Sequence, residues 1–314
     1  MLFSLPLLAL LPATVSAHGF VHKFWVNDKT FTGNVPQAQA TPSVVRQISQ
    51  VDPVKGATNP FVNCGPNAQL AKQVADANPG DKVSFLWTGG DLSKWPHNIG
   101  PMLTYMTNCG DDCTTFDSSK AKWFKIDQVG RIPGDKDGNW FQNRIFVQPN
   151  VAANVTLPSN LAPGNYLIRH EIIALHLATQ KGGAEFYPSC TQLRVGGSGT
   201  GVPAANELVQ LPGAYSDTDP GILVPKVFDD VTAPYAFPGP PVAAFVGGSS
   251  GATKSSSATS PSQTGSSSSS KGKSCKLKRT ATSSPSLKKR NIARPHKVSR
   301  IMRELAVGLR TVSQ

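Results

Sequence analysis

A histidine that can become the first residue of the mature chain is the residue with the clearest chemical potential. Residues 1–17 contain an apolar run and end in Val15-Ser16-Ala17, the small-residue pattern of a secretory signal and its cleavage site. Cleavage after Ala17 exposes His18 as an amino terminus. Its free α-amine and its imidazole can then close a chelate ring around one metal ion. A third nitrogen from another imidazole gives a T-shaped set, which suits Cu(II).

Cysteines are the second chemical feature, because five of them in a secreted chain indicate disulfides. Cys109 and Cys113 are close enough in sequence to close a small loop. Cys64 and Cys190 remain as a candidate long-range pair, and Cys275 stands alone near the end of the chain. A zinc site at Cys109 and Cys113 is the alternative, but no nearby Cys/His pair completes four ligands.

Charge is distributed unevenly along the chain. The formal net charge is +12, yet residues 18–246 hold 17 Lys+Arg against 18 Asp+Glu. Residues 247–314 hold the other 14 basic residues and one acid, Glu304. The positive charge therefore belongs to a tail and does not indicate a nucleic-acid partner for the folded part.

Composition divides the chain into four parts. Residues 1–17 are the expected signal peptide, and residues 18–246 are long enough for one domain with a sizeable core. Residues 247–270 form a Ser/Thr/Gly-rich linker. Residues 271–314 form a basic tail, for which we expect disorder or trimming at Lys288-Lys289-Arg290. A weak amphipathic helix around residues 300–310 and an incorrect gene end are the alternatives. No apolar run is long enough to span a membrane.

The folded part is expected to be all-β. Short segments rich in β-branched and aromatic residues alternate with Gly, Pro, Asn and Asp turns. We expect strands at residues 20–26, 82–87, 102–106, 123–126, 144–147, 165–173 and 192–195. Such a pattern predicts an immunoglobulin-like or fibronectin-like antiparallel β-sandwich with long loops. Asn154-Val155-Thr156 is an N-glycosylation sequon, which fits a surface turn of a secreted protein.

Several motifs place His18 in a larger pattern. They are His18-Gly19-Phe20-Val21, Trp95-Pro96-His97-Asn98-Ile99-Gly100-Pro101, Met102-Leu103-Thr104-Tyr105-Met106, the segment from Ala162-Pro163-Gly164 to Leu175-His176, Gly183-Ala184-Glu185-Phe186-Tyr187-Pro188-Ser189-Cys190, and Gly213-Ala214-Tyr215-Ser216-Asp217-Thr218-Asp219-Pro220-Gly221-Ile222. In order and spacing, this series resembles the fungal lytic polysaccharide monooxygenases of auxiliary activity family 9, formerly glycoside hydrolase family 61. The resemblance covers roughly residues 18–241.

The resemblance implies a role for each matching residue. His18 would supply its amine and imidazole to one copper ion, and His97 the third nitrogen. Tyr187 would stand at the axial position, and His176 would hydrogen-bond oxygen species near the copper. Tyr215 would lie on a flat copper-bearing face and stack on sugar rings. The family's disulfides match Cys64–Cys190 and Cys109–Cys113. Without the resemblance, His97 would be read as an ordinary loop histidine, Tyr187 and His176 as core residues, and Tyr215 as an ordinary exposed tyrosine.

Two positions depart from the family's pattern. Asn98 and Ile99 make two residues between His97 and the Gly-Pro pair, where the family often has one. Glu185 stands where most members carry glutamine. An amide donates a hydrogen bond at any pH, whereas a carboxyl group donates only when protonated. Glu185 is therefore expected to make the reaction pH-sensitive or to relay protons. The alternative is that it forms a salt bridge and replaces a structural amide.

The implied activity is oxidative cleavage of β-1,4-glucan chains of cellulose, at C1 and/or C4. It needs an external electron donor and O2 or H2O2. The protein is expected to be secreted and monomeric. Three rivals remain: a glycoside hydrolase, which needs a positioned carboxylate pair; a non-catalytic copper-binding protein; and a carbohydrate-binding module. The sequence leaves regioselectivity, and activity on xylan, xyloglucan or other glucans, open.

Overall fold

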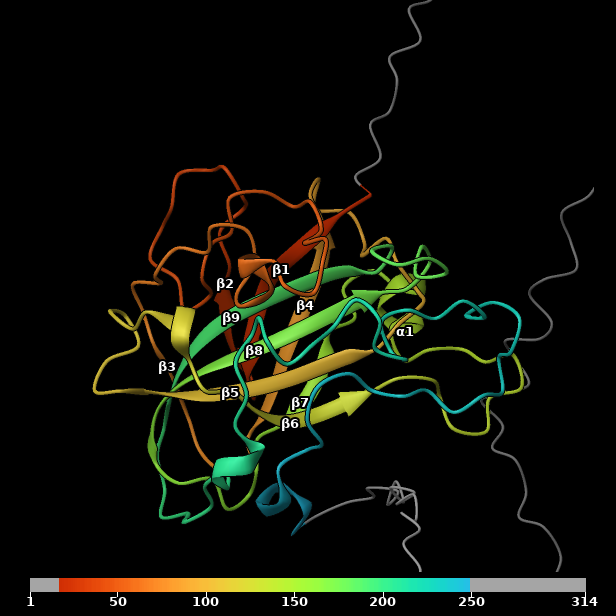
Figure 1. Ribbon diagram of the computed structural model, residues 1–314. Coiled ribbons are helices and arrows are strands. Elements are labelled where there is room, and N and C mark those ends of the chain that lie inside the picture. The colour runs from red at the N-terminus through yellow and green to blue at the C-terminus, as the bar shows by residue number, and fades with distance from the viewer. Residues whose placement is uncertain (1–16, 249–314) are drawn as a thin grey trace, which may run out of the picture. The chain divides into compact units, whose positions relative to one another are not determined.

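Two β-sheets form the body of the protein in the computed structural model, which describes residues 17–248. The four-stranded sheet has the order β2-β1-β4-β7 and the five-stranded sheet the order β3-β9-β8-β5-β6. All pairings within the sheets are antiparallel except that of β3 with β9. Strands of the two sheets cross one another in Figure 1. This is the antiparallel β-sandwich that the sequence predicts.

The strands are β1 (Gly19–Val26), β2 (Lys29–Thr32), β3 (Ala75–Ala77), β4 (Lys82–Gly89), β5 (Met102–Gly110), β6 (Phe124–Val129), β7 (Ala153–Thr156), β8 (Gly164–Ala174) and β9 (Glu185–Val195). The helices are α1 (Asn143–Val147) and the 3₁₀ helices η1 (Pro60–Val62), η2 (Ser118–Lys120), η3 (Ala205–Glu207) and η4 (Ala244–Gly248).

The hydrophobic core has two layers. One lies between the sheets and includes Phe24 and Phe85, whose ring centroids are 5.1 Å apart. The other covers the outer face of the five-stranded sheet beneath the long loops and includes Leu167 and Ile173. Strands β8 and β9 are thus buried on both faces, and almost every residue in them is buried. Strands of this kind lack the period-two alternation of a half-exposed strand, and these two also bury polar residues such as Arg169, Glu171 and Gln192.

Most of the predicted strands are confirmed. Six of the seven predicted segments coincide with β1, β4, β5, β6, β8 and the end of β9. The sequence did not indicate the short strands β2, β3 and β7, and β9 begins at Glu185 rather than at residue 192. The first part of β9 contains the motif Tyr187-Pro188-Ser189-Cys190, whose proline and small polar residues disfavour a central strand.

The strand predicted at residues 144–147 is wrong, because this segment lies in the short helix α1. Its Ile-Phe-Val run has high β-propensity. Local hydrogen bonds nevertheless close the turn, from the amide of Ile145 to the carbonyl of Gln142 (3.2 Å) and from Phe146 to the same carbonyl (3.3 Å). Ile145 is buried, and the Lys94 ammonium lies 4.4 Å from the centroid of the Phe146 ring. Tertiary contacts thus override the local preference.

Both expected disulfides are present, Cys64–Cys190 and Cys109–Cys113. Asn154 of the sequon is exposed on the edge strand β7 rather than on a turn, and its side chain accepts a hydrogen bond from Ser84 (2.7 Å). Glycosylation there remains a prediction.

Part of the predicted organisation lies outside the described residues: most of the signal peptide, nearly all of the linker, and the basic tail with Cys275. Within residues 17–248, no helix has the length and apolar character needed to cross a bilayer.

Candidate metal centre

His18 lies directly before β1 and is held there by its backbone. Its carbonyl accepts a hydrogen bond from the amide of Gly90, just after β4 (2.9 Å). The next residue, Gly19, has no room for a side chain, because a Cβ there would lie 1.9 Å from the carbonyl oxygen of Thr88. The imidazole is partly exposed, and its Nδ1 lies 3.3 Å from a carboxylate oxygen of Asp52. In the uncleaved chain the His18 nitrogen is a peptide amide, so an amine donor at this position would require cleavage after Ala17.

His97 lies on the loop between β4 and β5. Its ring stacks on that of His176 (centroids 4.7 Å apart, planes 15° apart) and meets the edge of the fully buried Trp95 (5.3 Å, 74°). The loop accommodates the extra residue in His97-Asn98-Ile99-Gly100, because the Ile99 carbonyl accepts a hydrogen bond from the Leu175 amide at 2.9 Å. This contact ties the loop beyond His97 to the end of β8.

Tyr187 stands at the centre of the group. Its hydroxyl lies 3.0 Å from Nε2 of His97 and donates a hydrogen bond to Oε2 of Glu185 (2.9 Å). Its ring centroid lies 6.4 Å from that of His18 and 5.4 Å from that of His97. Tyr187 and Glu185 point the same way because residues two apart on a strand share a face. The start of β9 therefore presents both groups to the two histidines.

Glu185 faces four polar side chains of the site. Its carboxylate forms a salt bridge with Lys55 (3.0 Å) and lies 3.6 Å from Nε2 of His97 and 3.7 Å from Nε2 of His176. The salt bridge is the structural alternative that the sequence left open. Because the same carboxylate also accepts the Tyr187 hydroxyl, it is part of the site and not only a support for it.

Electrostatics set the protonation of these groups. Burial, followed by the charge of His176, lowers the pKa of His97 to about 4. His97 is therefore neutral at neutral pH, the form that binds metals. Burial, followed by the charge of Glu185, raises the pKa of Tyr187 above its ordinary range, so that the phenol keeps its proton. Burial alone would raise the pKa of Glu185, but the hydrogen bonds from Lys55 and Tyr187 outweigh it and lower the pKa.

The donor set fits a copper ion. Nitrogen donors from neutral imidazoles and one weak phenol oxygen favour Cu(II) over Mg²⁺ or Ca²⁺, which prefer oxygen ligands. The structure brings His18, His97 and Tyr187 to one place, as the sequence predicts. Ligand atoms of His97, His176 and Glu185 also lie within 4.8 Å of one another. We favour the first set because a cleaved His18 adds an amine, and because Lys55 and Tyr187 already hold the Glu185 carboxylate.

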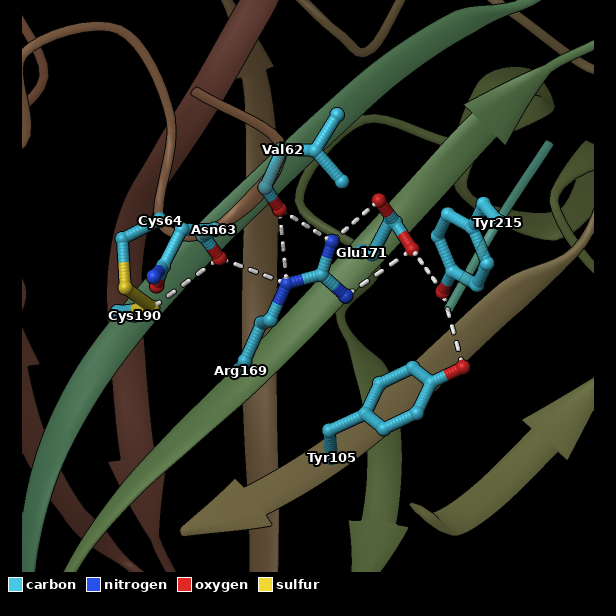
Figure 2. A network of polar contacts seen from close by, with 8 residues as sticks. All are labelled: Val62, Asn63, Cys64, Tyr105, Arg169, Glu171, Cys190 and Tyr215. Carbon is cyan, nitrogen blue, oxygen red and sulfur yellow. Dashed lines mark hydrogen bonds and ion pairs between the residues drawn. A yellow bond between two sulfur atoms is a disulfide. The ribbon is translucent and has the colours of Figure 1, made fainter. Parts of the chain in front are cut away.

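The prediction that Tyr215 stacks on sugar rings from an exposed face is wrong. Tyr215 is only 5% exposed, and its ring stacks on Phe186 inside the protein (6.0 Å, 15°). Its hydroxyl donates to a carboxylate oxygen of Glu171 (2.8 Å) and lies 2.9 Å from the Tyr105 hydroxyl. Figure 2 shows the contacts that run from Arg169 through Glu171 to Tyr215 and Tyr105. A ring whose faces are covered and whose hydroxyl completes a buried network has no face left for a sugar.

The buried ion pair in this network is structural. Neither the Arg169 nor the Glu171 side chain is exposed to solvent, and Nη1 of Arg169 lies 3.0 Å from Glu171. The guanidinium also donates to the carbonyls of Val62 and Asn63 (both 2.7 Å), next to the Cys64–Cys190 disulfide (Figure 2). The pair thus fastens η1 to β8. His170, beside it, is also structural, because its Nδ1 accepts a hydrogen bond from Trp87 (3.1 Å).

Two residues at the site were missed by sequence reasoning, Asp52 and Lys55. Both lie on the loop before η1, outside the matching motifs. One signal for Lys55 was available, since a buried glutamate in place of glutamine requires a counter-charge. The sequence does not say which of its many lysines provides it.

Comparisons with known proteins identify the family of the chain. Residues 18–235 match the family model of Auxiliary Activity family 9 (formerly GH61). The chain is 55% identical over 250 residues to the AA9 family lytic polysaccharide monooxygenase D of Gloeophyllum trabeum, covering 79% of this chain and 70% of that one. It is 37% identical over 252 residues to monooxygenase B of Heterobasidion irregulare (77% and 99% covered).

Solved structures give the same result. The crystal structure of HiLPMO9B matches with a TM-score of 0.65 at 35% identity, covering 72% of this chain and 99% of that one. The extended catalytic domain of H. jecorina LPMO9A matches with a TM-score of 0.64, also at 35% identity, covering 72% and 90%. The chain therefore belongs to Auxiliary Activity family 9, the family of these lytic polysaccharide monooxygenases.

Proposed function

We propose that the mature protein is a copper-dependent monooxygenase that oxidatively cleaves β-1,4-glucan chains of cellulose at C1 and/or C4. The observation that carries the proposal is the convergence of His18, a neutral His97 and the Tyr187 hydroxyl at one point of the sandwich. The family membership supports monooxygenase activity. Cellulose, the position of attack and the oxidant belong to the proposal.

Each residue of the proposed site has its own role. His18 and His97 would hold the copper ion, and the Tyr187 oxygen would be a further, weaker donor. Bound copper supplies the redox chemistry, in which an external electron donor and O2 or H2O2 lead to removal of a hydrogen atom from C1 or C4 of the glucan. Trp95, fully buried against both His97 and Tyr187, excludes water from the inner side of the site.

Glu185 acts in this scheme as a hydrogen-bond acceptor. Its lowered pKa keeps it charged at neutral pH, so it accepts a hydrogen bond from the Tyr187 hydroxyl and faces the Nε2 atom of His176. Since the carboxylate is protonated only as the pH falls into acid, the wild type is expected to show an acid transition in activity that Glu185→Gln lacks, and the two proteins become more alike in acid because a protonated carboxyl group resembles an amide. A transition near neutral pH that Glu185→Gln abolishes would instead support proton relay by Glu185.

The proposal also includes the cellular context. Residues 1–17 would direct secretion, residues 18–246 form the catalytic domain, residues 247–270 the linker, and residues 271–314 a tail without a catalytic role. The match of the family model to residues 18–235 supports a catalytic domain that begins at residue 18. The enzyme would act as an extracellular monomer, with Asn154 glycosylated.

Product analysis tests the proposal. The cleaved protein is loaded with copper and incubated with cellulose and ascorbate, and the released oligosaccharides are identified by mass spectrometry. Aldonic acids or C4-oxidised sugars are expected, and only with both copper and reductant. Products with ordinary reducing ends alone would indicate a glycoside hydrolase. Copper binding without product would indicate a non-catalytic copper protein, and cellulose binding without copper binding would indicate a carbohydrate-binding module.

A further inference from the structure

The buried carboxylate of Glu185 needs a counter-charge. The residue is 4% exposed, and its carboxylate faces His97 and His176 at 3.6 and 3.7 Å. A charged group removed from water is destabilising unless it is paired and hydrogen-bonded. A glutamine at this position would have no such requirement, because its amide is neutral.

Lys55 provides the charge from a segment that is fixed in place. Its ammonium lies 3.0 Å from Oε1 of Glu185 and donates to the carbonyl of Gly183 at 3.1 Å, so it spans the start of β9. The adjacent Val54 exchanges two backbone hydrogen bonds with Phe186 (2.9 and 3.0 Å). This pairing fixes the register of the loop against β9, and therefore the place where the lysine reaches the carboxylate.

The two oxygens of Glu185 have different partners. Oε1 meets Lys55, whereas Oε2 accepts the Tyr187 hydroxyl and faces His97 and His176. Anchoring Oε1 therefore fixes the direction of Oε2. When the Tyr187 proton points to Oε2, the lone pairs of the phenol oxygen remain available to a metal ion.

We propose that Lys55 is a positioning residue of the metal centre, and that Lys55 and Glu185 together replace the glutamine usual in the family. Lys55 would act on the copper site only through Glu185 and Tyr187. Although it is 44% exposed, its removal would leave the buried carboxylate without an ion pair at Oε1, held only by the Tyr187 hydroxyl at Oε2. This inference rests on the proposed function for its copper readout, but the coupling of the two residues does not depend on copper.

The test is a double-mutant cycle on the signal-cleaved protein, with Lys55→Met, Glu185→Gln and the double variant. Lys55→Arg keeps the charge, and Lys181→Met alters an exposed lysine on the loop before β9 as a matched control. Two readouts are the electron paramagnetic resonance spectrum of the Cu(II) form and the thermal midpoint of the copper-free form. A merely structural lysine would move the midpoint but not the spectrum.

Lys55→Met is expected to shift the Cu(II) hyperfine splitting and to lower the thermal midpoint by about 3–6 °C, which is less than for a fully buried pair because the lysine is half-exposed. The double variant is expected to resemble Glu185→Gln in both readouts, since the amide needs no partner. Lys55→Arg and Lys181→Met are expected to keep the wild-type spectrum.

Two results would overturn the inference: a Lys55→Met spectrum that superimposes on that of the wild type, or a double variant whose shifts are the sum of the two single shifts. These results differ from a failure of the proposed function. In that case the wild type itself binds no copper or releases no oxidised product, and the copper-free cycle still decides whether Lys55 and Glu185 act as a pair.

Discussion

Replacing Tyr215 with phenylalanine distinguishes a buried structural tyrosine from an exposed sugar-stacking one. The change removes the hydroxyl but keeps the ring, so the stacking on Phe186 survives. It deletes a 2.8 Å hydrogen bond to Glu171, a carboxylate with no exposed surface. Hydrogen bonds to charged groups contribute about 1.5–3 kcal/mol to stability. In a domain of this size that corresponds to a fall of roughly 3–12 °C in the thermal midpoint.

The assay is thermal and urea unfolding of wild type and Tyr215→Phe, with binding to cellulose measured in parallel. We expect the variant to be less stable and to bind cellulose as the wild type does. Phe228, which is 54% exposed, gives the matched control, because Phe228→Leu removes an exposed ring and is expected to leave stability nearly unchanged. Unchanged stability in Tyr215→Phe would refute the network in Figure 2 as a source of stability.

Two further predictions concern acid and the disulfides. Burial lowers the pKa of His170 to about 3, so its contribution to stability is complete above about pH 6.5 and is lost as the pH falls toward 3. Between these pH values, this group should lower the free energy of unfolding of the copper-free protein by up to about 1.4 kcal/mol per pH unit. His170→Asn should reduce the dependence of the unfolding free energy on pH, as measured by urea unfolding at several pH values. An unchanged dependence would contradict the assignment. Replacing both members of Cys64–Cys190, which are 126 residues apart, should cost about 5 kcal/mol, and replacing Cys109–Cys113, 4 apart, about 2 kcal/mol. Equal losses in denaturant unfolding would show that loop closure does not govern these contributions.

The fold was predictable wherever local pattern and burial agree. Strand β1, with its aromatic and β-branched residues, is confirmed at nearly the predicted length. The segment at residues 144–147 has equally strong β-propensity, yet it forms α1, since its neighbours in space decide its conformation. The start of β9 was missed because it contains Pro188 and small polar residues, which disfavour a central strand.

The site was predictable where a motif identifies the residue. The positions of His18, His97 and Tyr187 follow from the sequence, because each lies in a recognisable segment. The motif of Tyr215 gave no sign of burial. This tyrosine is buried because its hydroxyl binds the Arg169–Glu171 pair, which is distant in sequence and not visible in the motif. Lys55 and Glu185 are 130 residues apart in sequence and meet because their neighbours Val54 and Phe186 pair through their backbones. No local sequence pattern encodes such a contact.

The central claim is that signal cleavage creates the copper site by freeing the amine of His18. The most direct measurement compares two forms of the protein, one beginning at His18 and one that retains Ala17. Both are supplied with copper, ascorbate and cellulose, and the products are identified by mass spectrometry. Oxidised oligosaccharides are expected from the form that begins at His18 and not from the extended form. Equal amounts of oxidised product from the two forms would contradict the account.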